Sequence, residues 1–141
     1  MTEFKTHKNL LAWRLAMDTV MAVYRVTGRF PSEERYCLTS QMRRAANSVP
    51  SNIAEGQARG LARACLNFLR IALGSLAELD TQVEIALRLQ YISADTKKEL
   101  DDLIVETRKL VSGLQRAKAI RLGIHVTGAL AICFCLSEIV G

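Results

Sequence analysis

The chain has 141 residues, a net charge of +5, half of its residues hydrophobic, and only two prolines. This length fits one domain that buries its own core without metal or disulfide crosslinks, and the composition favours helices. The four cysteines, Cys37, Cys65, Cys133 and Cys135, form no C-x-x-C pair, and the polar segment 1–8 lacks the apolar core of a secretory signal. We therefore expect a cytoplasmic protein with reduced thiols, in which Cys37 and Cys65 are small core residues.

The positive charge is unevenly distributed along the sequence. Residues 1–70 hold 11 Lys or Arg against 5 Asp or Glu, whereas residues 71–141 hold 8 against 9. A basic face favours nucleic acid or another polyanion as a partner. The alternative is a charged surface that serves only solubility.

Apolar residues at helical spacing predict a first helix over about 7–27. One set of these residues faces inward and a second set lies on another face. A helix that is apolar on more than one face is buried on more than one side, and in a small bundle one of those sides must be a subunit interface. The pattern therefore predicts a homo-oligomer. The inner set is Leu10, Trp13, Met17, Val20, Met21 and Tyr24; the second set is Leu11, Leu15, Ala22 and Val26.

Gly28 is expected to end this helix, and Ser32 to cap a second one that continues to about residue 58. Pro50 lies inside the second helix, where it removes a backbone donor and should kink the helix without ending it. Four polar residues surround Pro50 and could support the kink. The inner stripe of this helix is Leu38, Met42, Ala45, Val49 and Ile53, and the polar residues are Asn47, Ser48, Ser51 and Asn52.

Gly60 marks the next turn, followed by a third helix over about 61–89 and a fourth that starts with Ser93 or Asp95 as its cap. Three short connections between four helices predict an all-α, up-down-up-down antiparallel bundle over residues 1–119. The third helix has Leu66, Leu69, Leu73, Leu76, Val83 and Leu87 on one seam, and the fourth has Leu100, Leu103, Ile104, Leu110, Val111 and Leu114.

Residues 120–141 form an apolar tail whose uninterrupted part, 126–136, is shorter than the roughly 20 residues of a membrane span. We do not expect membrane association. The tail either packs on the bundle or is disordered, and the sequence does not distinguish these alternatives.

The chain lacks the residues that enzymatic chemistry in a bundle requires. Its two histidines, His7 and His125, complete neither a Glu-x-x-His metal motif nor a catalytic triad. The carboxylates Glu78, Asp80 and Glu84 are expected to cap helices or to pair with arginines, including across a subunit contact. We predict a non-enzymatic protein with no cofactor and no metal.

Arginines are the main candidates for function, because they bind phosphates without reading base sequence. Arg43 and Arg44 point about 100° apart on a helix, so one is expected to bond a carboxylate in the assembly, such as Glu55 or Glu78, while the other faces solvent. No zinc finger, helix-turn-helix or RNP motif is present, and Trp13 is expected in the core with Tyr24. The candidate nucleic-acid-binding residues are Arg14, Arg43, Arg44, Arg59, Arg63 and Arg70.

Three segments carry a family resemblance: L-A-W-R-L-A-M-D at 11–18, Q-x-R-R-A-A-x-S-V-P-S-N-I-A-E-G at 41–56, and F-L-x-I-A-x-G-S-L-x-E-L at 68–79. With Y-x-x-T-x-x-F-P at 24–31, they resemble the four-helix-bundle proteins found as reading frames in 23S rRNA intervening sequences. The resemblance implies a structural role for Pro50, Ser51, Asn52, Glu55, Gly56 and Glu78. It also implies similarity to accessory proteins of diversity-generating retroelements, which form pentamers and work with a reverse transcriptase and its RNA.

Two functions follow from this sequence. The first is a basic homo-oligomer, with a pentamer favoured by the resemblance, that binds structured RNA or other nucleic acid by charge. The second is an adaptor that docks a protein partner such as a reverse transcriptase. Binding that weakens with salt favours the first function, and partner capture at high salt favours the second.

Overall fold

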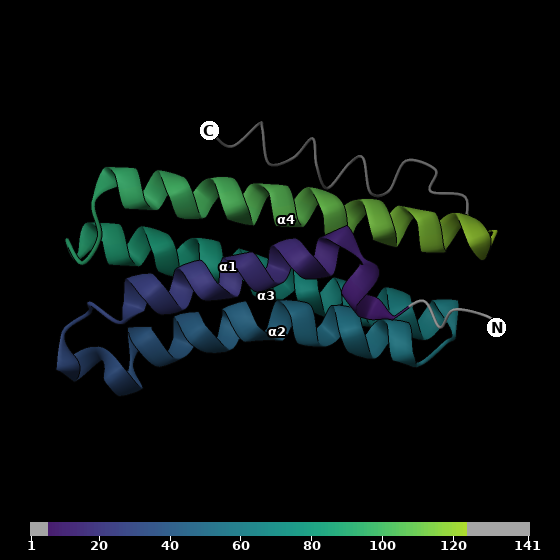
Figure 1. Cartoon of the computed structure of the whole chain (residues 1–141), viewed down its shortest axis with the longest axis horizontal. Helices are drawn as coiled ribbons and strands as arrows, with labels where there is room; N and C mark the ends of the chain where they lie inside the picture. Colours follow the sequence, from purple (N-terminus) through teal and green to yellow (C-terminus); the bar gives the residue numbers. More distant parts are fainter. Residues whose placement is uncertain (1–5, 124–141) are drawn as a thin grey trace.

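Four α-helices and two short 3-10 helices make up residues 6–123, the part of the chain that the computed structural model describes (Figure 1). The α-helices run antiparallel in an up-down-up-down bundle, which confirms the predicted fold class. Each packs against its neighbours in sequence, and α1 also packs against α4. The elements are η1 (His7–Asn9), α1 (Leu11–Thr27), η2 (Ser32–Tyr36), α2 (Leu38–Ala58), α3 (Ala62–Arg88) and α4 (Ala94–Arg121).

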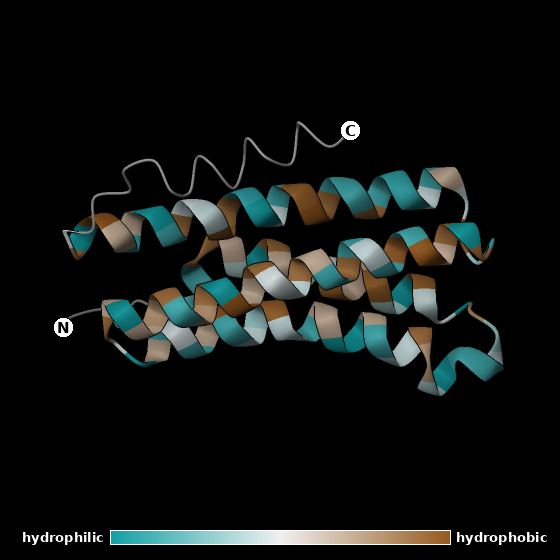
Figure 2. Ribbon diagram, turned by 180° about the vertical axis from the view of Figure 1, so that it is seen from behind, coloured by the Kyte–Doolittle hydropathy of each residue, from teal (hydrophilic) through white to brown (hydrophobic). Residues whose placement is uncertain are grey.

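Apolar and polar residues alternate along all four helices, so that one side of each helix contributes to a shared core (Figure 2). The stripes predicted on α2, α3 and α4 are confirmed. Met42, Val49 and Ile53 are buried on α2, and Leu69 and Leu76 on α3. Their burial removes large side chains from water along the whole length of the bundle, which is the main stabilising contribution to such a fold.

The stripe predicted on α1 is correct in part, since Val20 is buried and Leu10 and Trp13 pack against the core. Two of its members are wrong. Met21 is 63% exposed and Tyr24 is 39% exposed, whereas Ala12, Ala16 and Val23 are buried. Small residues on the inner side let α1 approach α2 and α4 closely, and the larger side chains lie at the edges of the contact. The helix also begins later than predicted, because Leu10 is extended and separates η1 from α1.

A pair of buried hydroxyls joins α1 to α4. Thr19 Oγ1 lies 3.0 Å from Thr107 Oγ1 and donates to the Leu15 carbonyl at 2.9 Å. Because the Thr19 proton is directed to that carbonyl, Thr107 is the donor of the pair. Both threonines are almost fully buried, so the hydrogen bonds offset the cost of removing two hydroxyls from water.

Replacing both hydroxyls of this pair should cost less than the two single replacements added together. Thr19→Val leaves the Thr107 hydroxyl without its acceptor, and we expect a loss of about 1–2 kcal/mol in the free energy of unfolding. Thr19→Val combined with Thr107→Val keeps the packing volume and leaves no orphaned partner. Urea denaturation at one protein concentration should show that the double variant loses less than the sum of the single losses. Additive losses would contradict this account.

The start of α2 differs from the prediction. Residues 32–36 form η2 instead of the first turn of α2, and Cys37 separates the two helices. Ser32 therefore does not cap α2. Glu34 takes that role, because its carboxylate accepts from the Leu38 amide at 3.0 Å and from the Tyr91 hydroxyl at 3.0 Å. Cys37 is exposed, which contradicts the predicted core position.

Cys65, in contrast, is buried as predicted. Burial raises the pKa of its thiol, against a smaller opposing effect of Lys118. The thiol therefore carries less of the reactive thiolate near neutral pH than an exposed cysteine would. Cys133 and Cys135 lie outside the described residues.

Pro50 does not end α2, which continues unbroken to Ala58 as predicted; the kink remains a prediction. The neighbouring polar side chains bond back to the helix. Ser51 Oγ donates to the Asn47 carbonyl at 2.8 Å, and Asn52 Nδ2 donates to the Ser48 carbonyl at 2.7 Å. Ser48 Oγ in turn accepts from Ser75 Oγ of α3 at 2.8 Å. These bonds satisfy the polar groups around the proline and fix the register between α2 and α3.

Gly56 marks the closest approach of these two helices. A Cβ at this position would lie 3.0 Å from Phe68 Cβ and 3.3 Å from both Cys65 Cα and the Cys65 carbonyl oxygen. None of these atoms is the flexible end of a side chain. Any residue can adopt the helical backbone conformation of Gly56. Glycine is therefore required at this position by the close packing and not by its conformation.

Gly56→Ala should destabilise the protein even though alanine favours helices. Overpacking costs about 1–3 kcal/mol, which exceeds the roughly 1 kcal/mol gained in helix propensity. Gly113→Ala is the matched control, because Gly113 lies in α4 with open space around the added Cβ. We expect the control to be neutral or more stable by up to about 1 kcal/mol in urea denaturation. A stabilised Gly56→Ala variant would contradict the close approach.

The remaining turns follow the sequence closely. Gly60 has φ +68°, a conformation that favours glycine, between α2 and α3. Ser93 caps α4 by accepting from the Thr96 amide at 3.2 Å, which selects it over Asp95. The fourth helix runs to Arg121, two residues beyond the expected end of the bundle, and most of the predicted tail, from residue 124 on, lies outside the described residues. None of the described helices is long and apolar enough to cross a membrane.

Candidate nucleic-acid interface

The antiparallel order of the helices concentrates basic residues in one half of the bundle. The turn between α2 and α3 and the end of α4 form one end of the bundle, on the right in Figure 1, and the start of α1 lies in the same half. We call the half that contains this end, residues 6–19, 48–75 and 108–123, the basic half. It holds ten Lys or Arg against two Asp or Glu, a formal charge of +8. The ten are Lys8, Arg14, Arg59, Arg63, Arg70, Arg108, Lys109, Arg116, Lys118 and Arg121.

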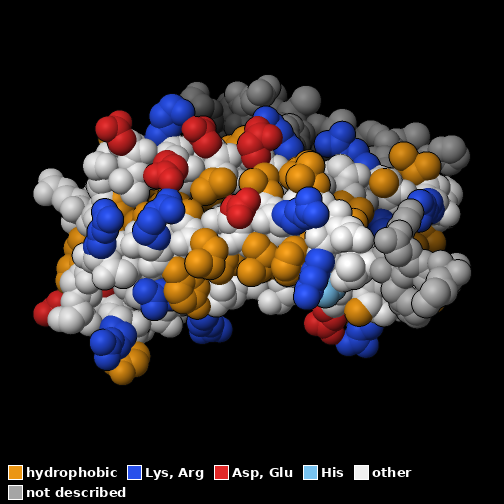
Figure 3. Space-filling view, viewed as in Figure 1, with side chains coloured by type: hydrophobic (Ala, Val, Ile, Leu, Met, Phe, Trp, Pro, Cys, Tyr) orange, Lys and Arg blue, Asp and Glu red, His pale blue; other side chains and the backbone are white. Residues whose placement is uncertain are grey.

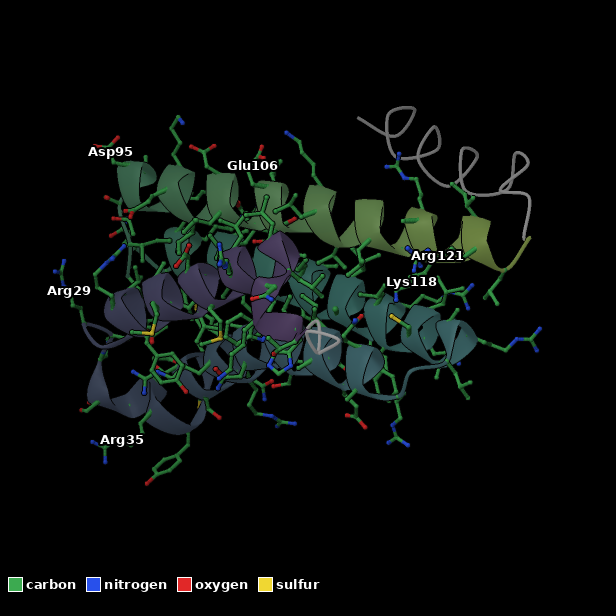
Figure 4. The ribbon with its side chains drawn as sticks, turned by 45° about the vertical axis from the view of Figure 1, so that its right-hand side comes forward. Arg29, Arg35, Asp95, Glu106, Lys118 and Arg121 are labelled. Atoms are coloured by element: carbon green, nitrogen blue, oxygen red, sulfur yellow. The ribbon has the colours of Figure 1, made fainter. Side chains whose placement is uncertain are left out.

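The other half has the opposite balance. Residues 20–47 and 76–107 hold eight Lys or Arg against ten Asp or Glu, a formal charge of −2. Figure 3 shows most of the acidic side chains of this face on the left or near the middle of the molecule. In Figure 4, Arg29, Arg35 and Asp95 lie toward the left and Lys118 and Arg121 toward the right. The described chain is therefore polarised along its long axis, which its net charge alone does not reveal.

Most cations near the end of the basic half have no ion pair within the described residues. Arg59 is the exception, since it contacts Glu55 at 2.7 Å and lies over the Phe68 ring at 5.6 Å. Lys118 is half-buried and its Nζ lies 3.5 Å from Gln57 Oε1. The C-terminal end of α4 favours the cations in its last turn through the helix dipole. The cations without an ion pair are Lys8, Arg14, Arg63, Arg70, Arg116, Lys118 and Arg121.

The structure brings together only part of the predicted site. Arg59 and Arg63 lie at the basic end and Arg14 lies in the same half of the bundle. Arg70 lies two turns along α3 from Arg63 on the same exposed side. The predicted pair at positions 43 and 44 lies in the other half of the bundle, near the end of α1. This pair therefore does not share a surface with the other four arginines.

Five cations of α4 in the basic half are absent from the predicted site. The balance of 8 against 9 over residues 71–141 concealed them, because acidic residues in the first half of α4 cancel them in the count. The signal was the order of charges within this one helix, with acidic residues early and basic residues late. Combined with the antiparallel topology, that order places the late cations beside the start of α1 and the α2–α3 turn. The five are Arg108, Lys109, Arg116, Lys118 and Arg121.

Arg43 and Arg44 have separate environments, as their helical spacing predicts. Arg44 is exposed, whereas Arg43 is half-buried between α1 and α2. Arg43 Nε donates to Thr27 Oγ1 at 2.9 Å, and its guanidinium carbon lies 4.5 Å from the centre of the Tyr24 ring. Asn47 Nδ2 donates to the Tyr24 hydroxyl at 3.0 Å. These contacts hold one arginine in a defined orientation against an aromatic ring.

The carboxylates take structural roles where the structure pairs them. Asp80 contacts Arg108 at 3.5 Å, and Glu84 contacts Arg88 at 2.8 Å, a hydrogen bond that lowers the pKa of Glu84. Glu55 pairs with Arg59, so it is not the partner of Arg43 or Arg44 within this chain. Glu78 is exposed and has no ion pair among residues 6–123. The same residues contain no group of three or more His, Cys, Asp or Glu that could hold a metal.

Fold and charge together define an all-α bundle with one strongly basic end. The sequence profile of the 23S rRNA-intervening sequence proteins matches residues 8–113, and the chain belongs to this family. The family assigned from the sequence motifs is thereby confirmed. A crystal structure of a protein of unknown function from the S23 ribosomal protein family of Bacteroides thetaiotaomicron has the same fold, with a TM-score of 0.70. It is 19% identical, and the alignment covers 75% of this chain and 96% of that protein. The comparison with curated proteins gave no match.

Proposed function

We propose that this protein is a non-enzymatic homo-oligomer of the cytoplasm that binds RNA or other nucleic acid by charge through its basic end. The observation that carries the proposal is the formal charge of +8 in one half of the described bundle, with most of the cations at its end free of ion pairs. Backbone phosphates attract such a surface whatever the base sequence. The family description, which refers to an intervening sequence of 23S rRNA, agrees with an RNA context.

The same surface argues for binding without sequence recognition. Its cations come from exposed positions on three helices and from the residues that flank them, and no helix of the described chain presents a zinc-finger or helix-turn-helix arrangement. Lysine binds a phosphate through a single ammonium group, and arginine can bind it through two N–H groups at once. Each such contact releases condensed counterions from the nucleic acid. Affinity should therefore fall steeply as salt rises, and by similar amounts for unrelated sequences.

The homo-oligomer part of the proposal is supported by exposed apolar side chains on α1. Leu11 and Met21 lie largely in solvent in the isolated chain, so the outer side of α1 carries exposed apolar residues among its charged ones. The family resemblance favours a pentamer. Light scattering at micromolar concentration should give a mass several times 15.7 kDa.

Two exposed arginines at the basic end provide the test of nucleic-acid binding. Arg63→Gln with Arg121→Gln should weaken binding to all sequences alike and reduce the slope of log affinity against log salt by about 2, roughly one per lost phosphate contact. Arg29→Gln with Arg35→Gln is the matched control, because it removes the same charge at the opposite end. Fluorescence anisotropy with labelled RNA and DNA at several salt concentrations measures both. Equal losses for the two variants would show a general charge effect and refute the site.

A second candidate function is a protein adaptor, with a reverse transcriptase as one such partner. It is favoured by exposed apolar residues at the same end of the bundle, namely Leu61 and Ile120 at positions flanked by cations. Mixed basic and apolar surfaces bind proteins as well as nucleic acids. Capture of the reverse transcriptase that survives high salt, by a correctly assembled oligomer that binds no labelled RNA at low salt, would replace the first function with this one.

A further inference from the structure

We propose that Arg43 of one copy binds the Glu78 carboxylate of a second copy, so that the surface between α1 and α2 receives the outer face of the neighbour's α3. We call the first surface the α1–α2 seam, formed by Met21, Tyr24, Arg43 and Asn47, and the second the α3 face, formed by Ile71, Gly74, Glu78 and Ile85. The inference rests on the homo-oligomer part of the proposed function and names the contact that builds the oligomer.

Arg43 is already arranged for a bidentate partner. Its Nε is bonded to Thr27 Oγ1, which itself donates to the Val23 carbonyl at 2.8 Å, and its guanidinium lies over the Tyr24 ring. These contacts engage one N–H and one side of the guanidinium plane. The two terminal nitrogens make no hydrogen bond to any residue of the described chain. A half-buried, oriented guanidinium loses little conformational freedom on binding, and its fork matches the two oxygens of a carboxylate.

The surroundings of Arg43 favour a protein carboxylate over a nucleic-acid phosphate. This half of the bundle has a formal charge of −2, so it does not attract a polyanion. The adjoining side chains include exposed apolar and aromatic ones beside the polar Asn47, since Met21 is 63% exposed and lies one turn from Tyr24 on α1. Tyrosine, methionine and arginine together are typical of the buried centre of protein interfaces.

Glu78 has the complementary environment on the exposed side of α3. It makes no ion pair within the described chain, and it lies two helical turns from Ile71 on one side and from Ile85 on the other. Those isoleucines are 51% and 41% exposed, which is high for large apolar residues. Gly74, one turn before Glu78, has open space around it, so another helix could approach closely. The α3 face therefore carries two exposed isoleucines with one free carboxylate between them.

Other carboxylates without ion pairs fit less well. Asp18 lies on α1 beside Met21, within the receiving side itself, and Glu33 and Asp95 lie in the first turns after connections. Arg44 is the competing cation for Glu78. The bond between Ser48 and Ser75 sets the register of α2 against α3. In this register Arg44 and Glu78 lie one turn from the bond, both in the same direction along the bundle. No salt bridge joins these two residues in the described chain.

The arrangement of helices makes this contact head-to-tail. α1 and α3 each pack against both α2 and α4, so they occupy diagonal corners of the bundle. The α1–α2 seam and the α3 face are consequently different surfaces that one copy can use at the same time, each toward a different neighbour. Such a heterologous contact generates a ring when its rotation closes.

Reversing either charge should break the assembly, and reversing both charges in one chain should restore it. Arg43→Glu alone and Glu78→Arg alone each place like charges together, and we expect association to weaken by at least about a hundredfold. The double variant, Arg43→Glu with Glu78→Arg, again has opposite charges at every contact, so its copies should associate whatever their number in the ring. Multi-angle light scattering at micromolar concentration measures the mass of each sample. Arg44→Glu is the matched control and should leave the mass of the oligomer unchanged.

Circular dichroism checks that each variant is folded. Glu78→Arg changes an exposed residue, so it must dissociate the oligomer even if Arg43→Glu unfolds the chain. An unchanged mass for folded Glu78→Arg would overturn the pairing, and so would a folded double variant that stays dissociated. A wild-type chain that is itself monomeric would refute the homo-oligomer of the proposed function, which distinguishes that failure from failure of the pairing alone.

Discussion

The contact between α2 and α3 is the constraint on which the rest of the bundle depends. Gly56 allows the two backbones to approach at one end, and the bond between Ser48 and Ser75 fixes their register near the middle. A shift by one turn would place a side chain against Gly56 and break the bond between the two serines. Because this register is fixed and the connections are short, the starts and ends of all four helices are fixed relative to one another. The surface charges then follow from the sequence order within each helix.

The family segments 41–56 and 68–79 therefore contain two kinds of residue, some that shape the packing of the bundle and some that lie at its surface. Pro50 and its polar neighbours shape α2 from within, and Gly56 shapes its contact with α3. Arg43 lies in the same segment but is only half-buried, and Glu78, in the segment 68–79, is exposed. Packing explains the first group completely, whereas nothing within one copy of the described chain accounts for Glu78. The contact proposed between copies would account for that residue.

Helical spacing of large apolar residues was sufficient to predict α2, α3 and α4 and their buried sides. It predicted α1 only in part, because the buried positions of that helix are filled by small residues, alanine, threonine and valine, whereas the larger Met21 and Tyr24 are exposed. The predicted core position of Cys37 was wrong for a different reason. Cys37 lies at the junction between η2 and α2, where a residue type that is usually buried is exposed. The basic end could not be found by counting charges along the sequence, because it is assembled from segments that are far apart in the chain. To predict the basic end, one needs the antiparallel topology of the bundle and the order of charges within α4.

The polarised charge gives the molecule an electric dipole parallel to its helices, and this has a kinetic consequence. A rod that is basic at one end and slightly acidic at the other experiences a torque near a polyanion and turns before it touches. Collisions would then occur preferentially end-on, with the helices perpendicular to the charged surface. Copies that associate through their sides with parallel axes would align these dipoles and present several basic ends in one plane. Such an assembly would present a flat basic surface to a nucleic acid, whereas a single copy would present one basic end.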